Sequence, residues 1–210
     1  MSGLSRRAAV ASAGAALLSA GASRVRAADD TDAAAPIRAL NDALLQAMRA
    51  GRATAFAERV KLVEPAVLRA FDLPQILHAS VGQRWAGLPA AQQAELADVF
   101  QRYTVASYVA NFDGYGGQRF EILPDLRAVG QDRVVQTRIV PPAGDPARID
   151  YQMRQTPDGW RAVDVLLDGT ISRVAVQRSD FRALVAAGDA ASLIASLRAK
   201  IARLEAGKQS

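Results

Sequence analysis

The spacing of apolar residues changes near residue 113, and this change constrains the fold more than any other feature of the chain. Before it, apolar side chains recur every three or four residues, as they do along one face of an α-helix. After it, the side chains alternate in character, as Val135, Thr137 and Ile139 alternate with Gln136 and Arg138. Helical spacing returns after residue 179. Helices followed by strands and then by helices predict an α+β fold.

Residues that start and stop helices mark where each helix should begin and end. The first helix is expected over residues 36–50, between Pro36 and Gly51, because proline suits a helix start and glycine a helix end. Residues 53–71 also have helical spacing, but Glu64-Pro65 interrupts them, so two short helices are expected there. Further helices are expected over residues 73–81, 89–111, 179–187 and 189–204.

A three-stranded antiparallel meander is expected in the middle of the chain. Its strands should run over residues 133–140, 149–153 and 160–167, after an earlier strand that ends at Leu123. An Asp-Gly pair at residues 158–159 supplies a hairpin turn between the last two strands. A short, twisted sheet with helices on one face forms a cone around an interior space. We therefore expect several helices packed on a twisted meander that encloses an apolar pocket.

The first 27 residues are typical of an export signal. Arg6 and Arg7 precede an alanine-rich apolar run, and Val25-Arg26-Ala27 fits a small-residue cleavage site. Paired arginines also fit a twin-arginine signal, so that route and ordinary secretion both stay open. We expect residues 1–27 to direct export to the periplasm, residues 28–35 to form a polar linker, and residues 36–206 to form a single domain. An uncleaved amphipathic arm is the alternative for the leader.

The basic excess of the chain lies in this leader. The whole chain has 26 basic and 21 acidic residues, which is a net charge of +5. Four of the arginines precede Ala28, so the rest of the chain has 22 basic and 21 acidic residues and is almost neutral. Nucleic-acid binding depends on a strongly basic surface, so no nucleic-acid partner is expected.

The chain lacks residues that many catalytic and metal sites require. It has no cysteine, one histidine, His78, and no G-x-S-x-G motif. These absences exclude a disulfide framework, a thiolate metal site, a two-histidine zinc site and a serine hydrolase of that type. We expect no metal, no cofactor and no enzymatic activity.

Asp164 and Asp168 are the strongest candidates for catalytic groups. Cone-shaped, NTF2-like folds include isomerases and dehydratases in which a buried aspartate acts as general base. In a regular strand, the side chain of Asp164 points away from Val163, Val165 and Leu167. If those apolar side chains form the pocket wall, Asp164 faces outward or toward a helix end, and Asp168 belongs to the Asp-Gly turn that follows. A structural role is favoured for both carboxylates, and the isomerase or dehydratase stays as the alternative.

Three stretches of the chain together resemble a known family. They are VGQRWAGLPAAQQAELADVFQRYTVASYVANFDGYGGQRFEI, ARIDYQMRQTPDGWRAVDVLLDG and RSDFRALVAAGDAASLIASLRAKI. In these stretches the chain is similar to the toluene-tolerance (MlaC-like) family of periplasmic phospholipid carriers. The resemblance implies a protein that carries a lipid between the inner and outer membranes. It also implies two docking partners, an inner-membrane transporter complex and an outer-membrane lipoprotein.

The segment after Gly169 is where the resemblance and local propensity disagree. Ile171, Val174 and Val176 are β-branched and favour a strand. The family has a helix here, which implies a helix start near Ser172. The TISRVAVQ sequence of this segment is similar to the subgroup associated with hopanoid biosynthesis. The resemblance therefore implies either a hopanoid or a phospholipid as cargo.

A lipid carrier needs an apolar pocket wall, and the meander together with the long helix supplies candidates. The residues expected to bind lipid are Phe100, Tyr103, Val135, Thr137, Ile139, Tyr151, Met153, Val163, Val165 and Leu167. Alternation alone does not decide which face of strand 160–167 looks inward. An adaptor that only bridges membrane complexes is a further alternative, and it would have a filled core with no tunnel.

Overall fold

The computed structural model describes residues 21–207, with side chains from residue 33 onward. Most of the expected export signal, residues 1–27, lies outside this part of the chain. The elements are α1 Gly21–Ala50, α2 Phe56–Ala70, α3 Leu73–Val81, the 3₁₀ helix η1 Gly82–Gly87, α4 Ala90–Asn111, β1 Arg119–Ile122, β2 Arg127–Val129, β3 Asp132–Val140, β4 Ala147–Thr156, β5 Gly159–Leu167, β6 Ile171–Ser172, α5 Arg173–Arg182 and α6 Ala191–Glu205. None of these helices is long and apolar enough to cross a membrane.

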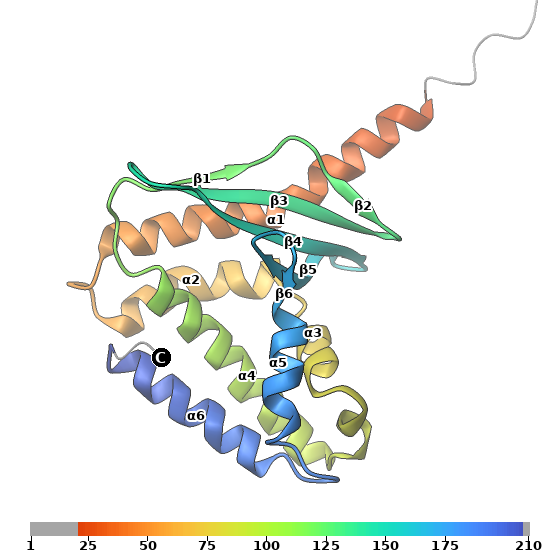
Figure 1. Cartoon of the computed structure of the whole chain (residues 1–210), viewed down its shortest axis with the longest axis vertical. Helices are drawn as coiled ribbons and strands as arrows, with labels where there is room; N and C mark the ends of the chain where they lie inside the picture. The colour runs from red at the N-terminus through yellow and green to blue at the C-terminus, as the bar shows by residue number, and fades with distance from the viewer. Residues whose placement is uncertain (1–20, 208–210) are drawn as a thin grey trace, which may run out of the picture.

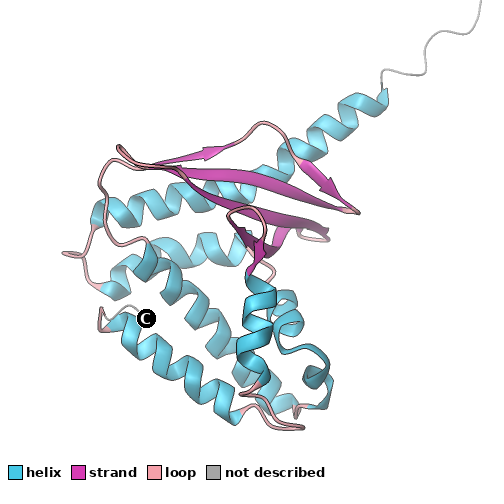
Figure 2. Ribbon diagram, in the orientation of Figure 1, coloured by secondary structure: helices cyan, strands magenta, loops and turns pink. Residues whose placement is uncertain are grey.

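The chain forms one antiparallel sheet with the helices gathered on one side of it (Figure 1; Figure 2). The strand order is β1-β3-β4-β5-β6, and β2 pairs with the same strand β3. The expected meander is confirmed as β3, β4 and β5, and the α+β class is confirmed with it. Strands β2 and β6 have only three and two residues, so their alternation is too short to be recognised in the sequence.

Helix α1 begins before the expected position at Pro36. It continues through Pro36, and Ala33 and Ala34 are buried. Ala33 lies one turn before Ile37, on the face that also buries Leu40. The apolar face of the helix therefore extends upstream of the proline. Residues 28–35 were expected to form a polar linker, but in the structure they belong to α1.

Helix α2 continues through Pro65, so the prediction of two short helices over residues 53–71 is wrong. Pro65 is exposed, and the backbone hydrogen bond that it cannot donate is lost at the protein surface. Val63 and Val67 lie on the opposite face and are fully buried. Their burial holds both halves of the helix against the core.

The described helices under the sheet form three packed pairs. Helix α1 packs on α2 and along β3 and β5, α4 packs on α6, and α3 packs on α5. Among the fully buried side chains are Phe100 and Leu96 of α4, Leu197 of α6 and Met153 of β4. One continuous core therefore joins the helices to the inner face of the sheet. Helices α3 and α5 also contact β5, which places the start of α5 at the edge of this core.

The segment after Gly169 is helical, as the family resemblance implied. Ser172 is the N-cap of α5, and its hydroxyl oxygen accepts a hydrogen bond from the backbone N–H of Ala175 at 2.9 Å. The side chains of Ile171 and Val176 are both exposed, so neither belongs to the core. Ile171 forms the short strand β6 and pairs with Leu167, whereas the β-propensity of Val176 is overridden by the cap and by the packing of α5 on α3.

The outer face of the sheet is polar and carries paired charges. Arg154 donates two hydrogen bonds to Asp132, at 2.9 and 2.8 Å, and Gln152 donates a third at 2.6 Å. Arg148 makes a comparable pair with the fully buried Asp150. The hydrogen bonds from Arg154 lower the pKa of Asp132 from its ordinary value, although partial burial opposes this effect.

Replacing Asp132 by Asn is expected to lower the free energy of unfolding at pH 7 by about 1–3 kcal/mol, because charge-assisted hydrogen bonds are lost. The pKa of Asp132 is depressed in the folded state, so its contribution is fully present above the unfolded pKa of about 3.9 and is lost as the pH falls through the folded value. Urea unfolding between pH 7 and 3 measures the free energy of unfolding as a function of pH. Below about pH 4, this free energy should fall less steeply for Asp132→Asn than for the wild-type protein.

The matched control for this experiment is Asp158→Asn. The side chain of Asp158 is 79% exposed and lies 3.8 Å from the guanidinium group of Arg161. The side chain of Asp132 is only 7% exposed. Equal effects of the two substitutions at pH 7 would contradict the stabilising role given to the Asp132 pair.

Candidate functional site

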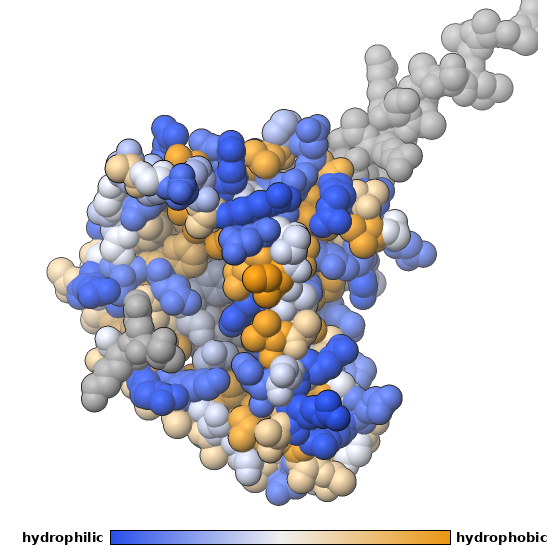
Figure 3. Space-filling model, in the orientation of Figure 1, coloured by the Kyte–Doolittle hydropathy of each residue, from blue (hydrophilic) through white to orange (hydrophobic). Residues whose placement is uncertain are grey.

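A cavity of about 380 Å³ lies between the sheet and helices α3, α4 and α5. It opens to the surface in the hollow between α4 and α5, and apolar side chains border that hollow (Figure 3). Its walls are mostly apolar and aromatic, as in many sites for apolar ligands. The lining residues are Phe71, Leu73, Ile76, Phe100, Tyr103, Thr104, Ser107, Tyr108, Asn111, Phe112, Ile149, Tyr151, Asp164, Val165, Leu167, Arg173, Val174 and Gln177.

A β-bulge in β5 determines which of its side chains face the cavity. The pairing of β4 with β5 shifts between Gln152 and Met153, so Met153 pairs with Ala162 whereas Tyr151 pairs with Val165. Paired residues lie on the same face of a sheet, so Ala162 and Val165 share a face although they are three positions apart, an offset that puts residues of a regular strand on opposite faces. Val165 and Leu167 consequently line the cavity.

Half of the residues expected to bind lipid lie on this cavity wall. Phe100 and Tyr103 of α4, Tyr151 of β4, and Val165 and Leu167 of β5 line it. Tyr151 of β4 pairs directly with Val165 of the neighbouring strand β5. The wall thus combines residues of the long helix α4 and of the meander.

The other expected residues, Val135, Thr137, Ile139, Met153 and Val163, do not line the cavity, which corrects the prediction. Val135 and Met153 share the face of Tyr151 but are fully buried in the core that α1 helps to form. The Thr137 hydroxyl donates a hydrogen bond to the carbonyl oxygen of Ile149. Ile139 pairs with Phe120 near the β1 edge, and Val163 is the extra residue of the bulge.

Several residues that line the cavity were not predicted, and the sequence pattern pointed to only some of them. Ile149 alternates in step with Tyr151, so it belonged with the predicted face. Thr104, Ser107 and Asn111 recur at three- and four-residue spacing on α4, but they are polar and were not expected in an apolar wall. The other lining residues that were not predicted are Phe71, Leu73, Ile76, Tyr108, Phe112, Arg173, Val174 and Gln177.

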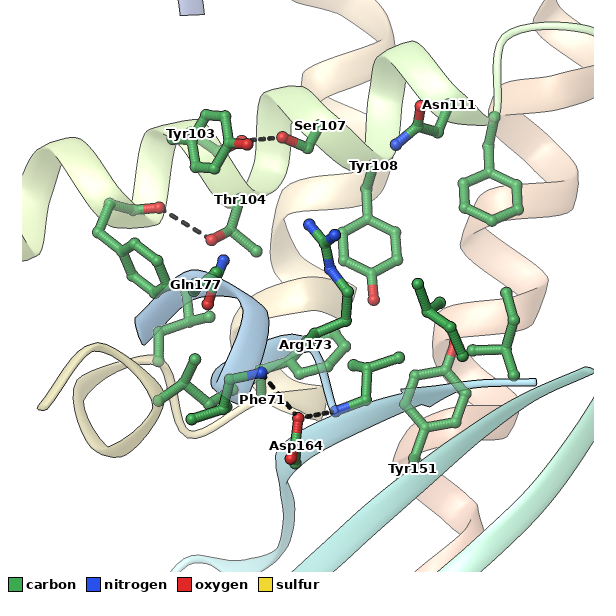
Figure 4. A pocket seen from close by; sticks show the side chains of 18 residues that line it. Phe71, Tyr103, Thr104, Ser107, Tyr108, Asn111, Tyr151, Asp164, Arg173 and Gln177 are labelled. Atoms are coloured by element: carbon green, nitrogen blue, oxygen red, sulfur yellow. Dashed lines mark hydrogen bonds between the residues drawn. The ribbon is translucent and has the colours of Figure 1, made fainter. Parts of the chain in front are cut away.

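The polar side chains of α4 are mostly satisfied within the helix. The Thr104 hydroxyl donates to the carbonyl oxygen of Phe100 at 2.9 Å, and the Ser107 hydroxyl donates to that of Tyr103 at 2.7 Å (Figure 4). These hydroxyl donors are therefore already used within the helix, and the oxygens are left as acceptors.

The end of the cavity next to the sheet is aromatic. The ring centroid of Phe71 lies 5.5 Å from that of Tyr108 and 6.1 Å from that of Tyr151, and Tyr108 stacks on Phe112 at 6.0 Å. Burial raises the pKa of both tyrosine hydroxyls well above the ordinary value, and the neighbouring Tyr151 raises that of Tyr108 further. Both phenols are neutral at physiological pH, so this end of the cavity carries no anionic charge.

The two candidate carboxylates have structural positions. Asp168 is exposed in the turn after β5, with a positive φ of 50°, and its backbone N–H donates to the carbonyl oxygen of Arg148 at 3.0 Å. Asp164 borders the cavity, but its oxygens accept hydrogen bonds from the backbone N–H groups of Val165 and Val174 and from the Ser172 hydroxyl. Asp164 therefore points toward the start of α5 and fixes it, although it also lines the cavity.

The lone histidine also lies outside the cavity wall. The ring of His78 packs beside Trp85, with the centroids 5.8 Å apart. Neither residue lines the cavity. The cavity wall thus holds no histidine to act as general base beside Asp164.

A comparison with protein families identifies the group to which the chain belongs. The family model described as MlaC protein matches residues 38–199, which is most of the chain and includes every residue of the cavity wall. The chain belongs to the MlaC family. The toluene-tolerance resemblance is confirmed by this match, whereas the hopanoid-associated subgroup is not distinguished by it.

The MlaC fold is also found in a solved structure. The phospholipid-binding protein from Ralstonia solanacearum, determined in complex with a phospholipid, superposes with a TM-score of 0.71. The alignment covers 82% of this chain and 98% of that one, at 22% sequence identity. At this identity the likeness establishes the shared fold. No curated protein matches the chain.

Proposed function

We propose that this MlaC-family protein binds a lipid in the cavity between α4, α5 and the sheet and carries it through an aqueous compartment. The observation that carries this proposal is the apolar, aromatic wall of a cavity that is open to the surface. Membership of the MlaC family and the phospholipid bound by the Ralstonia protein support it. A cavity of this kind also favours a carrier over an adaptor with a filled core.

A physical argument explains why such a carrier is needed. Burying one methylene group is worth about 0.8 kcal/mol, so a lipid with ~30 of them is held out of water by roughly 25 kcal/mol. Spontaneous transfer through water is then extremely slow. A protein that supplies an apolar cavity lowers this barrier without any catalytic group, and release requires an acceptor that offers comparable burial.

The cargo, the compartment and the partners follow from the same proposal. The cargo is a phospholipid or a hopanoid, and the protein moves it between the inner and outer membranes of a periplasm. The arginine pair and alanine-rich run of residues 1–27 support export, with residues 36–206 as the lipid-carrier domain. An inner-membrane transporter complex and an outer-membrane lipoprotein are the docking partners that the family resemblance implies.

Native mass spectrometry of the gently purified protein tests the proposal. The expected result is a population whose mass exceeds that of the chain by one lipid, and whose lipid is released on collisional activation. The same protein should move labelled phospholipid between two liposome populations faster than the spontaneous rate. A protein that retains no lipid and transfers none would sink the proposal.

A further inference from the structure

Arg173 is the one basic residue among the described residues that line the cavity. It is the first residue of α5, where that helix leaves the sheet. Its side chain runs from α5 toward Tyr108 of α4, and the guanidinium group lies beside the phenol ring (Figure 4). Arg173 is exposed, so its charge lies at the opening of a mostly apolar cavity, between the two helices that border the opening.

The guanidinium group of Arg173 has no hydrogen-bond or salt-bridge partner in the described part of the chain. Other arginines of the same protein do have such partners, as Arg148 has Asp150 and Arg154 has Asp132. The one carboxylate on the described cavity wall is Asp164, whose oxygens already accept two hydrogen bonds from the start of α5 and one from the backbone N–H of Val165. Arg173 thus lines the cavity with a guanidinium group that Asp164 does not engage.

The electrostatic field of Arg173 acts on the cavity interior. Burial raises the pKa of the Tyr108 phenol, and the positive charge of Arg173 opposes that rise. A cation next to an apolar wall is poorly solvated on one side, so an anion placed there interacts with it more strongly than in bulk water. The backbone at the start of α5 does not compete for this anion, because Ser172 and Asp164 already cap it.

A lipid with an anionic group close to its apolar tail matches this arrangement. Its tail would occupy the aromatic interior, and its anionic group would reach the cavity opening. A guanidinium group donates paired hydrogen bonds to phosphate or carboxylate oxygens, which adds geometric fit to the charge attraction. An uncharged polycyclic lipid would leave Arg173 without a partner at the opening.

We propose that Arg173 binds the anionic group of the cargo and so makes the cavity selective for phosphate- or carboxylate-bearing lipids over uncharged ones. This inference rests on the proposed lipid-carrier function and narrows it. Among the two cargoes considered above, it favours the phospholipid over an uncharged hopanoid. Arg173 is a specificity-determining residue in this view, and the cavity wall supplies the rest of the affinity.

Binding of matched lipid pairs to the delipidated protein tests this inference. Dipalmitoyl phosphatidic acid and dipalmitoyl glycerol differ by the phosphate, and palmitate and hexadecanol differ by the carboxylate. The wild-type protein should prefer the anionic member of at least one pair, and Arg173→Gln should reduce that preference about tenfold or more. The affinity for the neutral lipids should stay unchanged, and Arg173→Lys should restore part of the preference.

Arg102→Gln is the matched control, because Arg102 is an exposed residue of α4 that does not line the cavity. This variant should keep the wild-type preference. A preference only within the phosphatidic acid pair identifies phosphate as the recognised group, and a preference only within the palmitate pair identifies carboxylate. Added salt should weaken either preference in the wild-type protein more than in Arg173→Gln.

The possible failures are distinguishable. Equal binding of the anionic and neutral lipids by the wild-type protein would overturn the role of Arg173 while leaving the carrier function in place. An undiminished anionic preference in Arg173→Gln would do the same. If no lipid of either pair binds, the carrier function fails and the inference fails with it. Circular dichroism and thermal unfolding check that each variant is folded.

Discussion

Replacing Val165 by Trp is expected to lower the lipid occupancy of the purified protein sharply without unfolding it. Val165 faces the cavity directly opposite Tyr151, and its side chain is only half-buried because it borders empty space. An indole ring at this position would fill space that a lipid tail otherwise occupies. Excluding about three methylene groups costs roughly 2 kcal/mol of binding free energy, which is about a thirtyfold loss of affinity.

Native mass spectrometry measures the lipid-bound fraction of Val165→Trp, and circular dichroism checks the fold. Val129→Trp is the matched control, because Val129 is 39% exposed on the short strand β2 and lies away from the cavity wall. The control should retain lipid at the wild-type level. Unchanged occupancy in Val165→Trp would mean that this cavity is not where the lipid binds.

Replacing Met153 by Ala is expected to have the opposite pattern, with a large loss of stability and little change in lipid binding. Met153 was expected on the cavity wall, but its side chain is fully buried in the core between the sheet and the helices. Truncating a buried methionine removes apolar burial and leaves a void, which costs about 2–5 kcal/mol. The free energy of unfolding should fall by that amount in urea titrations.

Leu62→Ala is the control for the stability measurement. Leu62 is 39% exposed on α2, so its truncation should change the free energy of unfolding by no more than about 0.5 kcal/mol. Under conditions where Met153→Ala is still folded, its lipid-bound fraction should equal that of the wild-type protein. A selective loss of lipid with normal stability would place Met153 on the lipid-binding surface after all.

The helices that the sequence predicted correctly have clear local boundaries. Gly82 ends α3 with a positive φ of 69°, and Pro89 directly precedes α4, so short-range backbone preferences were sufficient there. The errors at Pro36 and Pro65 share one cause. A proline costs one backbone hydrogen bond, and the burial of apolar residues on both sides of it, such as Val63 and Val67, outweighs that cost once the core is formed.

The candidate site was predictable only in part, for a related reason. Alternation grouped Tyr151 with Met153 and Val165 with Leu167, but it did not decide which face looks inward and did not separate a cavity wall from a filled core. Whether a side chain such as Met153 meets α1 or empty space depends on which helix lies above it. That is a matter of helix packing, which local spacing does not encode.

The α+β order, the meander and the absence of a usable histidine or cysteine follow from the sequence alone, because they depend on residue identity and short-range spacing. Two features of the site depend on contacts between distant segments. The bulge at Val163 arises from the pairing of β4 with β5, and it places Val165 on the same face as Ala162. The charge of Arg173 reaches the cavity because Asp164 of β5 caps α5 and so fixes where that helix begins.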